Sequence, residues 1–349
     1  MSKFISKKYD NLTPYVPGEQ PKEKLIKLNT NESPFPPSPL SSRLARQAAG
    51  ELNLYSDPDC KKLKSVFSDR YGIDEENLIF TNGSDEILNF AVATFCDRDT
   101  PAYFPEVTYG FYKVYCELYG VPYTEIKLNP DLSVNYKDYL NVGGTVIIAN
   151  PNAQTGTNMP LKEVEEIVAS NPKNVVIVDE AYVDFGGESA RYLTKKYPNL
   201  LVVGTFSKSR SLAGARLGYG IADKEMIEDL NKIRYSTNPF DVNKMTEAAG
   251  IGSILDDDYF TKNCKTIIET REYLKANLIR LGFDVVPSSA NFLLAKHKDR
   301  SGKELASKLR EKGILIRRFD MPKISEHIRI TIGSKEETEI LIKTLKELL

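Results

Sequence analysis

Three short runs of apolar residues constrain the fold of this chain most. They lie at 145–149, 175–178 and 200–203, and β-branched side chains dominate them. Because each run is continuous rather than alternating and is bounded by turn residues, it predicts a strand that is buried on both faces. Such strands belong to mostly parallel sheets that helices cover on both sides. The sequence therefore predicts an α/β fold.

The length of 349 residues exceeds one ordinary core and suits a large domain with a smaller one. We predict an N-terminal arm at residues 1–40, a large domain at 41–240 and a small α/β domain at 241–349. The arm is dense in Pro, Asn and Ser, so we expect an extended segment that packs with the small domain. A disordered tail is the alternative, since Pro-rich termini are commonly disordered.

Composition and charge exclude several function classes. The formal net charge of −1 provides no general attraction to nucleic acid or to anionic membranes. The N-terminus lacks the apolar segment of a signal peptide, and no run approaches the ~18 apolar residues of a membrane span. Four widely spaced cysteines and two histidines offer no metal-ligand pattern. We expect a cytoplasmic protein without metal, nucleic-acid or membrane partners.

Lys208 follows the third apolar run almost at once. Hydroxyl side chains, an arginine and several glycines surround it in the sequence; the side chains are Thr205, Ser207, Ser209, Ser211 and Arg216. These are the parts of an anion-binding pocket beside an amine. Pyridoxal phosphate (PLP) chemistry requires both, because a lysine forms a Schiff base with the cofactor while hydroxyls, arginine and backbone N–H groups hold its phosphate. An isolated lysine would more often be solvated surface.

The segment TFSKSRSLAGARLGYG resembles the Schiff-base lysine segment of the class I/II, fold-type I aminotransferases. Together with the segments below, it is most similar to that of the histidinol-phosphate aminotransferases, and the resemblance extends over nearly the whole chain. It implies the fold-type I architecture, with PLP bound to Lys208. The same lysine would then serve as the base and acid of the proton transfer.

The second apolar run delivers Asp179 at its C-terminal end, where ligand sites of parallel sheets lie. A carboxylate there can keep the pyridine nitrogen of PLP protonated. The resemblance assigns this role to Asp179 and assigns the bond to the phenolic oxygen to Tyr182. This chain has NPNAQTG where the family pattern is NPxNPTG. Alanine therefore replaces the asparagine that bonds this oxygen in the family. We transfer that role to Asn152.

A helix start at Gly83, Ser84 and Asp85 favours a phosphate, because its N–H groups are unpaired. A plain helix cap is the alternative. The resemblance implies that this helix start binds the PLP phosphate together with Thr205, Ser207 and Arg216, and that the ring of Tyr109 stacks on the pyridine. Without the resemblance, Tyr109 would be an ordinary core aromatic.

Tyr55 lies in the turn LYSDPDC between two expected helices. An aromatic residue in such a turn is as often a packing anchor as a functional group. In the family, the tyrosine of this segment bonds the cofactor phosphate in the partner subunit. The resemblance therefore implies a homodimer with shared sites.

Four further positions correspond to family residues near the substrate, namely Tyr15, Asn291, Arg317 and Arg329. A guanidinium suits bidentate binding of a carboxylate or a phosphate, so Arg329 is expected to bind the donor's α-carboxylate and Arg317 the substrate phosphate. These residues predict an amino transfer between L-histidinol phosphate and 2-oxoglutarate, giving L-glutamate, in histidine biosynthesis.

Other functions remain open at this stage. An aromatic amino acid aminotransferase and a threonine-phosphate decarboxylase share several of these motifs. A non-catalytic binding module could retain the fold, although Lys208 and Asp179 argue against it. An NAD-dependent dehydrogenase is disfavoured, because no GxGxxG joins a strand to a helix.

Overall fold

The computed structural model describes residues 4–10 and 12–349. Its largest sheet has seven strands in the order β2-β8-β7-β6-β5-β3-β4. Only β8 in this sheet is antiparallel to its neighbours, so the expected mostly parallel sheet is confirmed. The strands are β2 (Leu78–Asn82), β3 (Ala102–Pro105), β4 (Tyr123–Ile126), β5 (Thr145–Ala149), β6 (Val176–Asp179), β7 (Leu200–Thr205) and β8 (Leu217–Ile221).

The three apolar runs form β5, β6 and β7 at the centre of this sheet, as predicted. Every residue of the three strands is buried. In β5, Ile147 packs into one hydrophobic cluster, whereas Val146 and Ile148 pack into another on the opposite face. This arrangement explains the continuous apolar pattern, because successive side chains of a strand point to opposite faces and both faces are covered.

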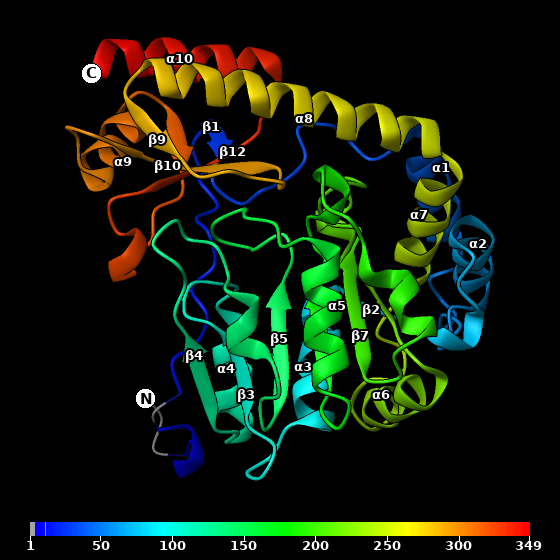
Figure 1. Ribbon diagram of the computed structural model, residues 1–349. Helices are drawn as coiled ribbons and strands as arrows, with labels where there is room; N and C mark the ends of the chain where they lie inside the picture. Colours follow the sequence, from blue (N-terminus) through cyan, green and yellow to red (C-terminus); the bar gives the residue numbers. More distant parts are fainter. Residues whose placement is uncertain (1–3, 11) are drawn as a thin grey trace.

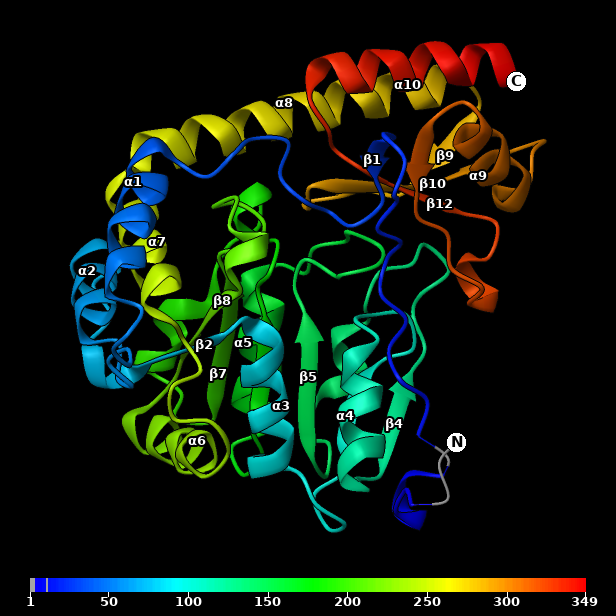
Figure 2. The same ribbon diagram turned by 180° about the vertical axis from the view of Figure 1, so that it is seen from behind.

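Helices cover both faces of the sheet. α5 (Leu161–Ser170) lies on the face seen in Figure 1, and α3 (Ser84–Phe95) and α4 (Phe111–Tyr119) lie on the face seen in Figure 2. α6 (Lys224–Thr237) packs against α3. The parallel strands all end at the edge that faces the C-terminal part of the chain (Figure 1), and this edge carries Asp179.

The C-terminal part forms a smaller α/β unit. Strands β9 (Phe283–Val285), β10 (Phe292–His297) and β12 (Ile328–Thr331) make an antiparallel sheet in the order β12-β10-β9. Helices α9 (Gly302–Glu311) and α10 (Lys335–Leu348) belong to this unit, and α8 (Asp257–Arg280) spans the molecule above the large sheet (Figure 1).

The N-terminal arm is ordered over its apolar segment. Its strand β1 (Ile26–Leu28) pairs in parallel with β11 (Ile314–Ile316) of the C-terminal unit. The arm then continues across the edge of the large sheet to α1 (Pro39–Ala48), where Ser38 caps the helix through its hydroxyl. The pairing of β1 with β11 accords with an arm that packs with the small domain.

The boundary expected at residue 240 does not follow the packing. α7 (Lys244–Leu255) lies beyond it, yet α7 packs on α1 and on α2 (Lys61–Tyr71), beside the large sheet. A Cβ on Gly250 would meet Leu217 of β8 and Leu63. We therefore propose that the small domain begins near the start of α8.

Over the described ranges, no helix combines the length and apolarity that crossing a bilayer requires.

Candidate active site

A cavity of about 270 Å³ opens beside Lys208, at the C-terminal ends of β6 and β7. This cavity is lined by most of the residues that the sequence predicts for the site, although these residues come from five separate segments. These residues are Ser84, Asp85, Tyr109, Asp179, Tyr182, Thr205, Ser207, Lys208 and Arg216. The edge where parallel strands end therefore brings them together, as open α/β sheets do.

Lys208 stands on the short loop that follows β7. Its Nζ donates one long hydrogen bond, 3.3 Å, to the carbonyl oxygen of Thr30 in the arm. The Nζ also lies 5.9 Å from the centre of the Tyr182 ring. No carboxylate of the described residues pairs with this ammonium group within 4.0 Å. The amine is thus partly buried and available for chemistry.

Asp179 is the last residue of β6 and is almost fully buried. Its Oδ2 accepts a 2.7 Å hydrogen bond from the hydroxyl of Tyr112, and its Oδ1 accepts one from the N–H of Ala181. Burial raises the pKa of Asp179 to about 6, while these two bonds act in the opposite direction. A buried carboxylate in this position is suited to pair with a cationic ring nitrogen.

Tyr182 follows Asp179 into the cavity, and its hydroxyl accepts a 3.0 Å hydrogen bond from Nδ2 of Asn31. Asn152 does not line the cavity. Its Nδ2 donates to the carbonyl oxygen of Val107, and its Oδ1 accepts from the N–H groups of Gln154 and Thr155. The amide of Asn152 therefore bonds its own loop and the carbonyl of Val107, which weighs against the transferred role. Ala153, by contrast, does line the cavity.

The opposite end of the cavity offers donors for an anion. α3 begins at Ser84 without a side-chain cap, and Gly83 before it has a φ of 81°. A Cβ on Gly83 would lie 2.5 Å from Nη2 of Arg216, so only glycine allows the guanidinium this close. The helix start and Arg216 thus converge, which suits a phosphate.

Hydroxyl groups complete this end. Thr205 Oγ1 donates to Ser207 Oγ at 3.0 Å, and the N–H of Ser207 donates back to Thr205 Oγ1. Arg216 pairs with Asp85 Oδ2 at 2.7 Å, and the hydroxyl of Tyr109 donates to Asp85 Oδ1 at 2.6 Å. Asp85 therefore orients both a cation and the aromatic ring beside it.

A second cavity of about 200 Å³ adjoins the first and also reaches Lys208. Tyr109, Ala153 and Tyr182 border both cavities. The second one adds Tyr15, Arg317 and Arg329, three of the four residues expected near the substrate. The amine of Lys208 consequently borders both cavities. Hydrogen-bond donors and the carboxylate of Asp179 line the first, and two arginines line the second.

The comparisons with known proteins agree with this geometry. Residues 23–345 match the family described as aminotransferase class I and II. The chain belongs to the class I and II aminotransferases. It is also 46% identical to histidinol-phosphate aminotransferase 1 of Hydrogenovibrio crunogenus over 100% of this chain and 99% of that protein. Identity to the histidinol-phosphate aminotransferase of Brachyspira hyodysenteriae is 46%, over 99% of each chain.

Solved structures show the same fold. The histidinol-phosphate aminotransferase of Sinorhizobium meliloti, solved in complex with pyridoxal-5'-phosphate, superposes with a TM-score of 0.86 over 93% of this chain and 92% of that one, at 24% identity. The L-threonine-O-3-phosphate decarboxylase of Porphyromonas gingivalis gives a TM-score of 0.80 at 21% identity, over 93% and 99% of the two chains. The expected fold-type I architecture is confirmed.

Besides Gly83 and Asn152, two further expected residues lie outside both cavities of this aminotransferase. Asn291 is fully buried, and its Nδ2 donates to the carbonyl oxygen of Asn31, so it fastens the arm beside the site. Tyr55 is 81% exposed and stacks on Phe240 with ring centres 4.5 Å apart. Neither residue lines the space around Lys208 in its own chain.

Two side chains that hydrogen-bond expected cavity residues, Tyr112 and Asn31, are among those not expected from the sequence. Tyr112 bonds Asp179, and Asn31 bonds Tyr182. Tyr112 lies among several aromatic residues in α4, so its sequence context does not distinguish it from the core. For Asn31, the polar cluster Asn29 to Glu32 after an apolar segment was an available signal.

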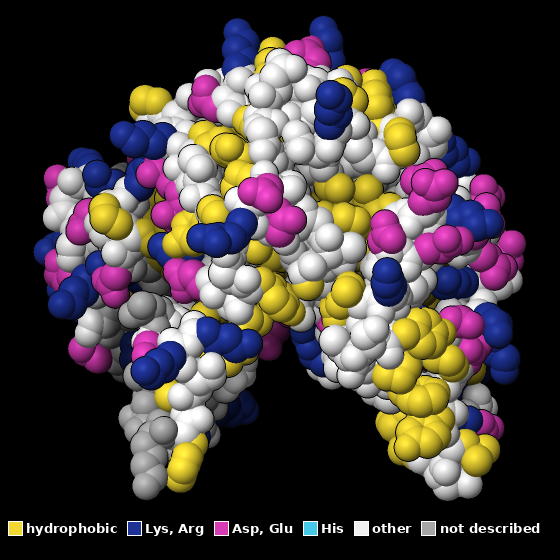
Figure 3. Space-filling view, turned by 90° about the horizontal axis from the view of Figure 1, so that it is seen from below, with side chains coloured by type: hydrophobic (Ala, Val, Ile, Leu, Met, Phe, Trp, Pro, Cys, Tyr) yellow, Lys and Arg dark blue, Asp and Glu magenta, His cyan; other side chains and the backbone are white. Residues whose placement is uncertain are grey.

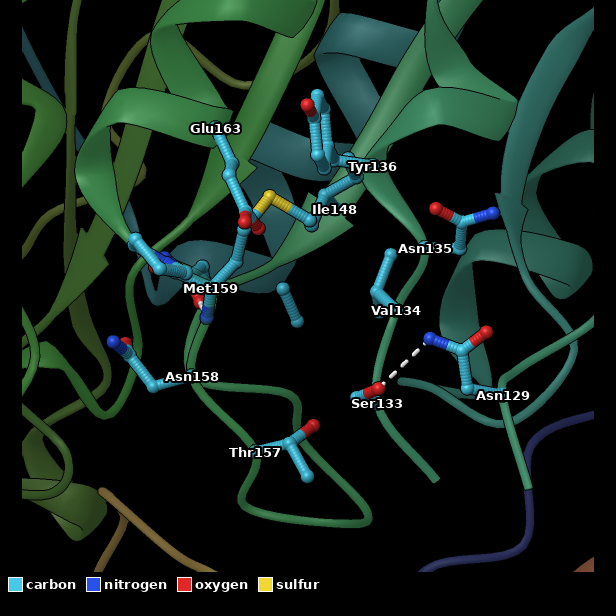
Figure 4. A pocket seen from close by; sticks show the side chains of 13 residues that line it. Asn129, Ser133, Val134, Asn135, Tyr136, Ile148, Thr157, Asn158, Met159 and Glu163 are labelled. Atoms are coloured by element: carbon cyan, nitrogen blue, oxygen red, sulfur yellow. Dashed lines mark hydrogen bonds between the residues drawn. The ribbon is translucent and has the colours of Figure 1, made fainter. Parts of the chain in front are cut away.

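A third cavity, of about 300 Å³, lies beside the end of β5 and the loop that follows it (Figure 4). Asn129 donates to Ser133 at its rim, and Asn158 and Glu163 also border it. None of the residues expected at the active site of the aminotransferase lines this cavity. It is therefore separate from the two cavities that border Lys208.

Proposed function

We propose that this aminotransferase is PLP-dependent and transfers the amino group between L-histidinol phosphate and 2-oxoglutarate in histidine biosynthesis, in the cytoplasm. One observation carries the proposal: Lys208 borders two adjoining cavities. The first contains the donors for an anion and the buried carboxylate of Asp179, and the second contains two arginines. The full-length relatives at 46% identity support the same substrate.

The residues of the first cavity fit PLP. The cofactor carries a phosphate, a ring nitrogen, a phenolic oxygen and an aldehyde. The start of α3 with Ser84, Thr205, Ser207 and Arg216 suits the phosphate, and Asp179 suits the nitrogen. Two observations support this match. Glycine at position 83 leaves room for Arg216, and no Lys or Arg of the described residues lies within 4.0 Å of the buried carboxylate of Asp179.

The chemistry then divides between the cofactor and the chain. When bound, PLP supplies a carbonyl group that condenses with amines and a ring that withdraws electrons from the attached carbon. Asp179 holds a proton at the ring nitrogen, which keeps the ring electron-withdrawing. Tyr182 donates its hydroxyl to the phenolic oxygen, and Asn31 fixes that hydroxyl. Lys208 moves the proton from the substrate Cα, because its Nζ borders both cavities and no carboxylate of the described residues pairs with it within 4.0 Å.

Arg329 and Arg317 bind the substrates in this proposal. Arg329 is almost fully buried, and the guanidinium of Arg317 donates to the carbonyl oxygens of Val16 and Pro17 in the arm. Among the described residues, no Asp or Glu lies within 4.0 Å of either guanidinium. Both arginines therefore keep their charge for a carboxylate or a phosphate ester, with Tyr15 as an aromatic wall.

A comparison of donors tests the substrate. Values of kcat/KM would be measured for histidinol phosphate, histidinol, phenylalanine, tyrosine and threonine phosphate, each with 2-oxoglutarate. We expect histidinol phosphate to give the highest value. A higher value for phenylalanine or tyrosine would refute the substrate but not the amino transfer. Carbon dioxide release from threonine phosphate without amino transfer would refute both.

We also propose a homodimer in which Tyr55 serves the partner's site. Tyr55 and its neighbours Leu52, Leu54 and Phe240 are exposed apolar side chains, and Tyr55 does not reach its own Lys208 cavity. Figure 3 shows hydrophobic side chains gathered beside a deep hollow in the molecular surface. Exposed apolar patches of this kind mark protein interfaces.

Subunit mixing tests the shared site. A Lys208→Ala protomer and a Tyr55→Ala protomer would each have low activity as homodimers. Mixed dimers should regain activity, because one of their two sites carries both native residues. The proposal fails if confirmed subunit exchange restores no activity or if a monomer is fully active.

A further inference from the structure

Two distant segments carry the stacked rings of Tyr55 and Phe240. Tyr55 lies in the turn at 52–60 before α2, and Phe240 lies in the connection between α6 and α7. The hydroxyl of Ser56 in the turn also donates to the carbonyl oxygen of Val242 in the connection, at 2.6 Å. The direction of the Tyr55 ring therefore depends on how the turn and the connection are held together.

The guanidinium of Arg234 contacts both segments. Arg234 lies in the last turn of α6 and is 2% exposed. Its Nη1 donates to the carbonyl oxygen of Pro58 in the turn at 2.6 Å, and its Nη2 lies 3.7 Å from Oδ1 of Asp59. Nη1 also lies 3.6 Å from Oδ1 of Asp241 in the connection. A guanidinium can serve these acceptors together, because it carries five N–H donors in a fixed, planar arrangement.

The partner of Arg234 in the connection is as buried as the arginine. The side chain of Asp241 is 1% exposed, and among the described residues Arg234 is the only Lys or Arg within 4.0 Å of its carboxylate. Burial and the neighbouring Glu86 raise the pKa of Asp241 to about 7, while Arg234 acts in the opposite direction. Loss of Arg234 would therefore neutralise Asp241 or leave a buried charge unpaired. In either case the turn and the connection would lose the group that they share.

Tyr55 lines neither of the two cavities beside Lys208 in its own chain. We infer that Arg234 is a positioning residue for the cofactor site of the partner subunit: by joining the turn to the connection, it holds the Tyr55 ring in the direction that reaches the partner. This role rests on the proposed homodimer, in which Tyr55 serves the partner's site. Loss of Arg234 should consequently impair the site of the other subunit rather than the site of its own.

Two heterodimers, each purified through two different affinity tags, distinguish this role from a general structural one. In the first, one subunit carries Lys208→Ala and the other carries Arg234→Gln. In the second, one subunit carries both substitutions and the other is wild type. Each heterodimer thus contains the same two substitutions and a single Lys208. Only in the second does the subunit with Arg234→Gln supply Tyr55 to that Lys208.

Occupancy of the single Lys208 by PLP would be measured in both heterodimers. Borohydride reduction fixes the lysine-bound cofactor, and mass spectrometry then quantifies it over a range of PLP concentrations. We expect the Kd for PLP to be about 10-fold higher in the second heterodimer than in the first, because a weakened contact to a charged phosphate is lost only there. In the first, the Kd should stay within about 3-fold of the wild-type value.

Three further substitutions, each placed in the same two heterodimers, calibrate this difference. Tyr55→Ala should give a difference in the same direction and at least as large. Arg234→Lys should give a smaller one, because an ammonium group keeps a charge beside Asp241 but is a single point that cannot serve both segments. Arg271→Gln is the matched control: Arg271 is also buried and donates to two backbone carbonyl oxygens, but these lie outside the turn and the connection. It should not raise the Kd selectively in the second heterodimer.

Equal Kd values in the two Arg234→Gln heterodimers, or a higher value in the first, would overturn the inference, because the substitution would then act on its own subunit. If Tyr55→Ala gives the expected difference and Arg234→Gln does not, the role of Arg234 fails while the shared site stands. If Tyr55→Ala gives no difference either, both fail. Should Arg234→Gln not fold, Arg234→Lys decides the question by the same criterion.

Discussion

Replacing Gly218 by alanine tests how the anion site is built. Gly218 lies in β8 and pairs with Thr81 of β2, directly beneath the turn that starts α3. A Cβ at this position would lie 2.3 Å from the backbone N of Ser84 and 2.4 Å from the carbonyl carbon of Gly83. Both are backbone atoms, so no side-chain rotation can relieve the contact. The turn itself must move.

The size of the effect follows from these contacts. Overpacking of a tight interior costs about 1–3 kcal/mol, and backbone neighbours favour the upper part of that range. The start of α3 cannot retreat freely, since Gly83 already faces Arg216. A displaced Ser84 N–H also weakens phosphate binding, and a hydrogen bond to a charged group contributes about 1.5–3 kcal/mol. We therefore expect unfolding free energy to fall by about 2–3 kcal/mol and the Kd for PLP to rise about 10- to 100-fold.

Urea unfolding of the cofactor-free protein and titration with PLP measure the two effects. Gly143→Ala is the matched control, because a Cβ there would meet no atom within 4 Å. The reasoning is refuted if Gly218→Ala unfolds within about 0.5 kcal/mol of the wild type and binds PLP equally well. A change in stability without a change in PLP affinity would separate the turn from the phosphate site.

Three further predictions concern charged groups. Lys208→Ala should abolish amino transfer in steady-state assays, and wild-type turnover in this variant would refute the role of the amine. Arg317→Ala should cost about 2–5 kcal/mol in kcat/KM for histidinol phosphate and change the values for aromatic donors little; an equal loss for phenylalanine would contradict a phosphate contact. Burial raises the pKa of Glu180 to about 7, so the native state keeps a proton that the unfolded chain loses near its ordinary value of 4.5. Unfolding free energy should therefore fall by about 3 kcal/mol as pH rises from 4.5 to 7, and Glu180→Gln should remove that part of the slope in pH-dependent urea unfolding; an unchanged slope would contradict it.

The central sheet could be predicted because local sequence determines it. β5, β6 and β7 are continuous apolar runs, and buried strands in a covered parallel sheet need that pattern. Their C-terminal ends then place Asp179 and Lys208 at one edge without any knowledge of the rest. The antiparallel direction of β8 was not expected, because the glycine-rich segment Leu217–Ile221 carries no signal for strand direction.

Contacts between distant segments could not be predicted from the residues alone. Tyr112 and Asp179 are 67 positions apart, and only the packing of α4 on the sheet brings them together. The role transferred to Asn152 shows that side-chain contacts are also hard to predict between neighbouring residues. Asn152 and Ala153 are neighbours in the sequence, but the Asn152 amide bonds its own loop while Ala153 faces the cavity. Adjacent side chains point in different directions here, so a role in the cavity cannot be transferred from position 153 to position 152.

The arm also sets the time at which the site can be completed during synthesis. The N–H of Asn31 donates to Oγ1 of Thr331, 300 positions later in the chain, and β1 pairs with β11. At about 5–20 residues per second, a ribosome needs roughly 15–60 s to make the residues between them. Throughout that interval the arm has emerged without its partner strand, and Asn31 lacks the hydroxyl that holds it beside Tyr182. We therefore expect the nascent large domain to fold first, and the arm to close over Lys208 only after the last strand has left the ribosome.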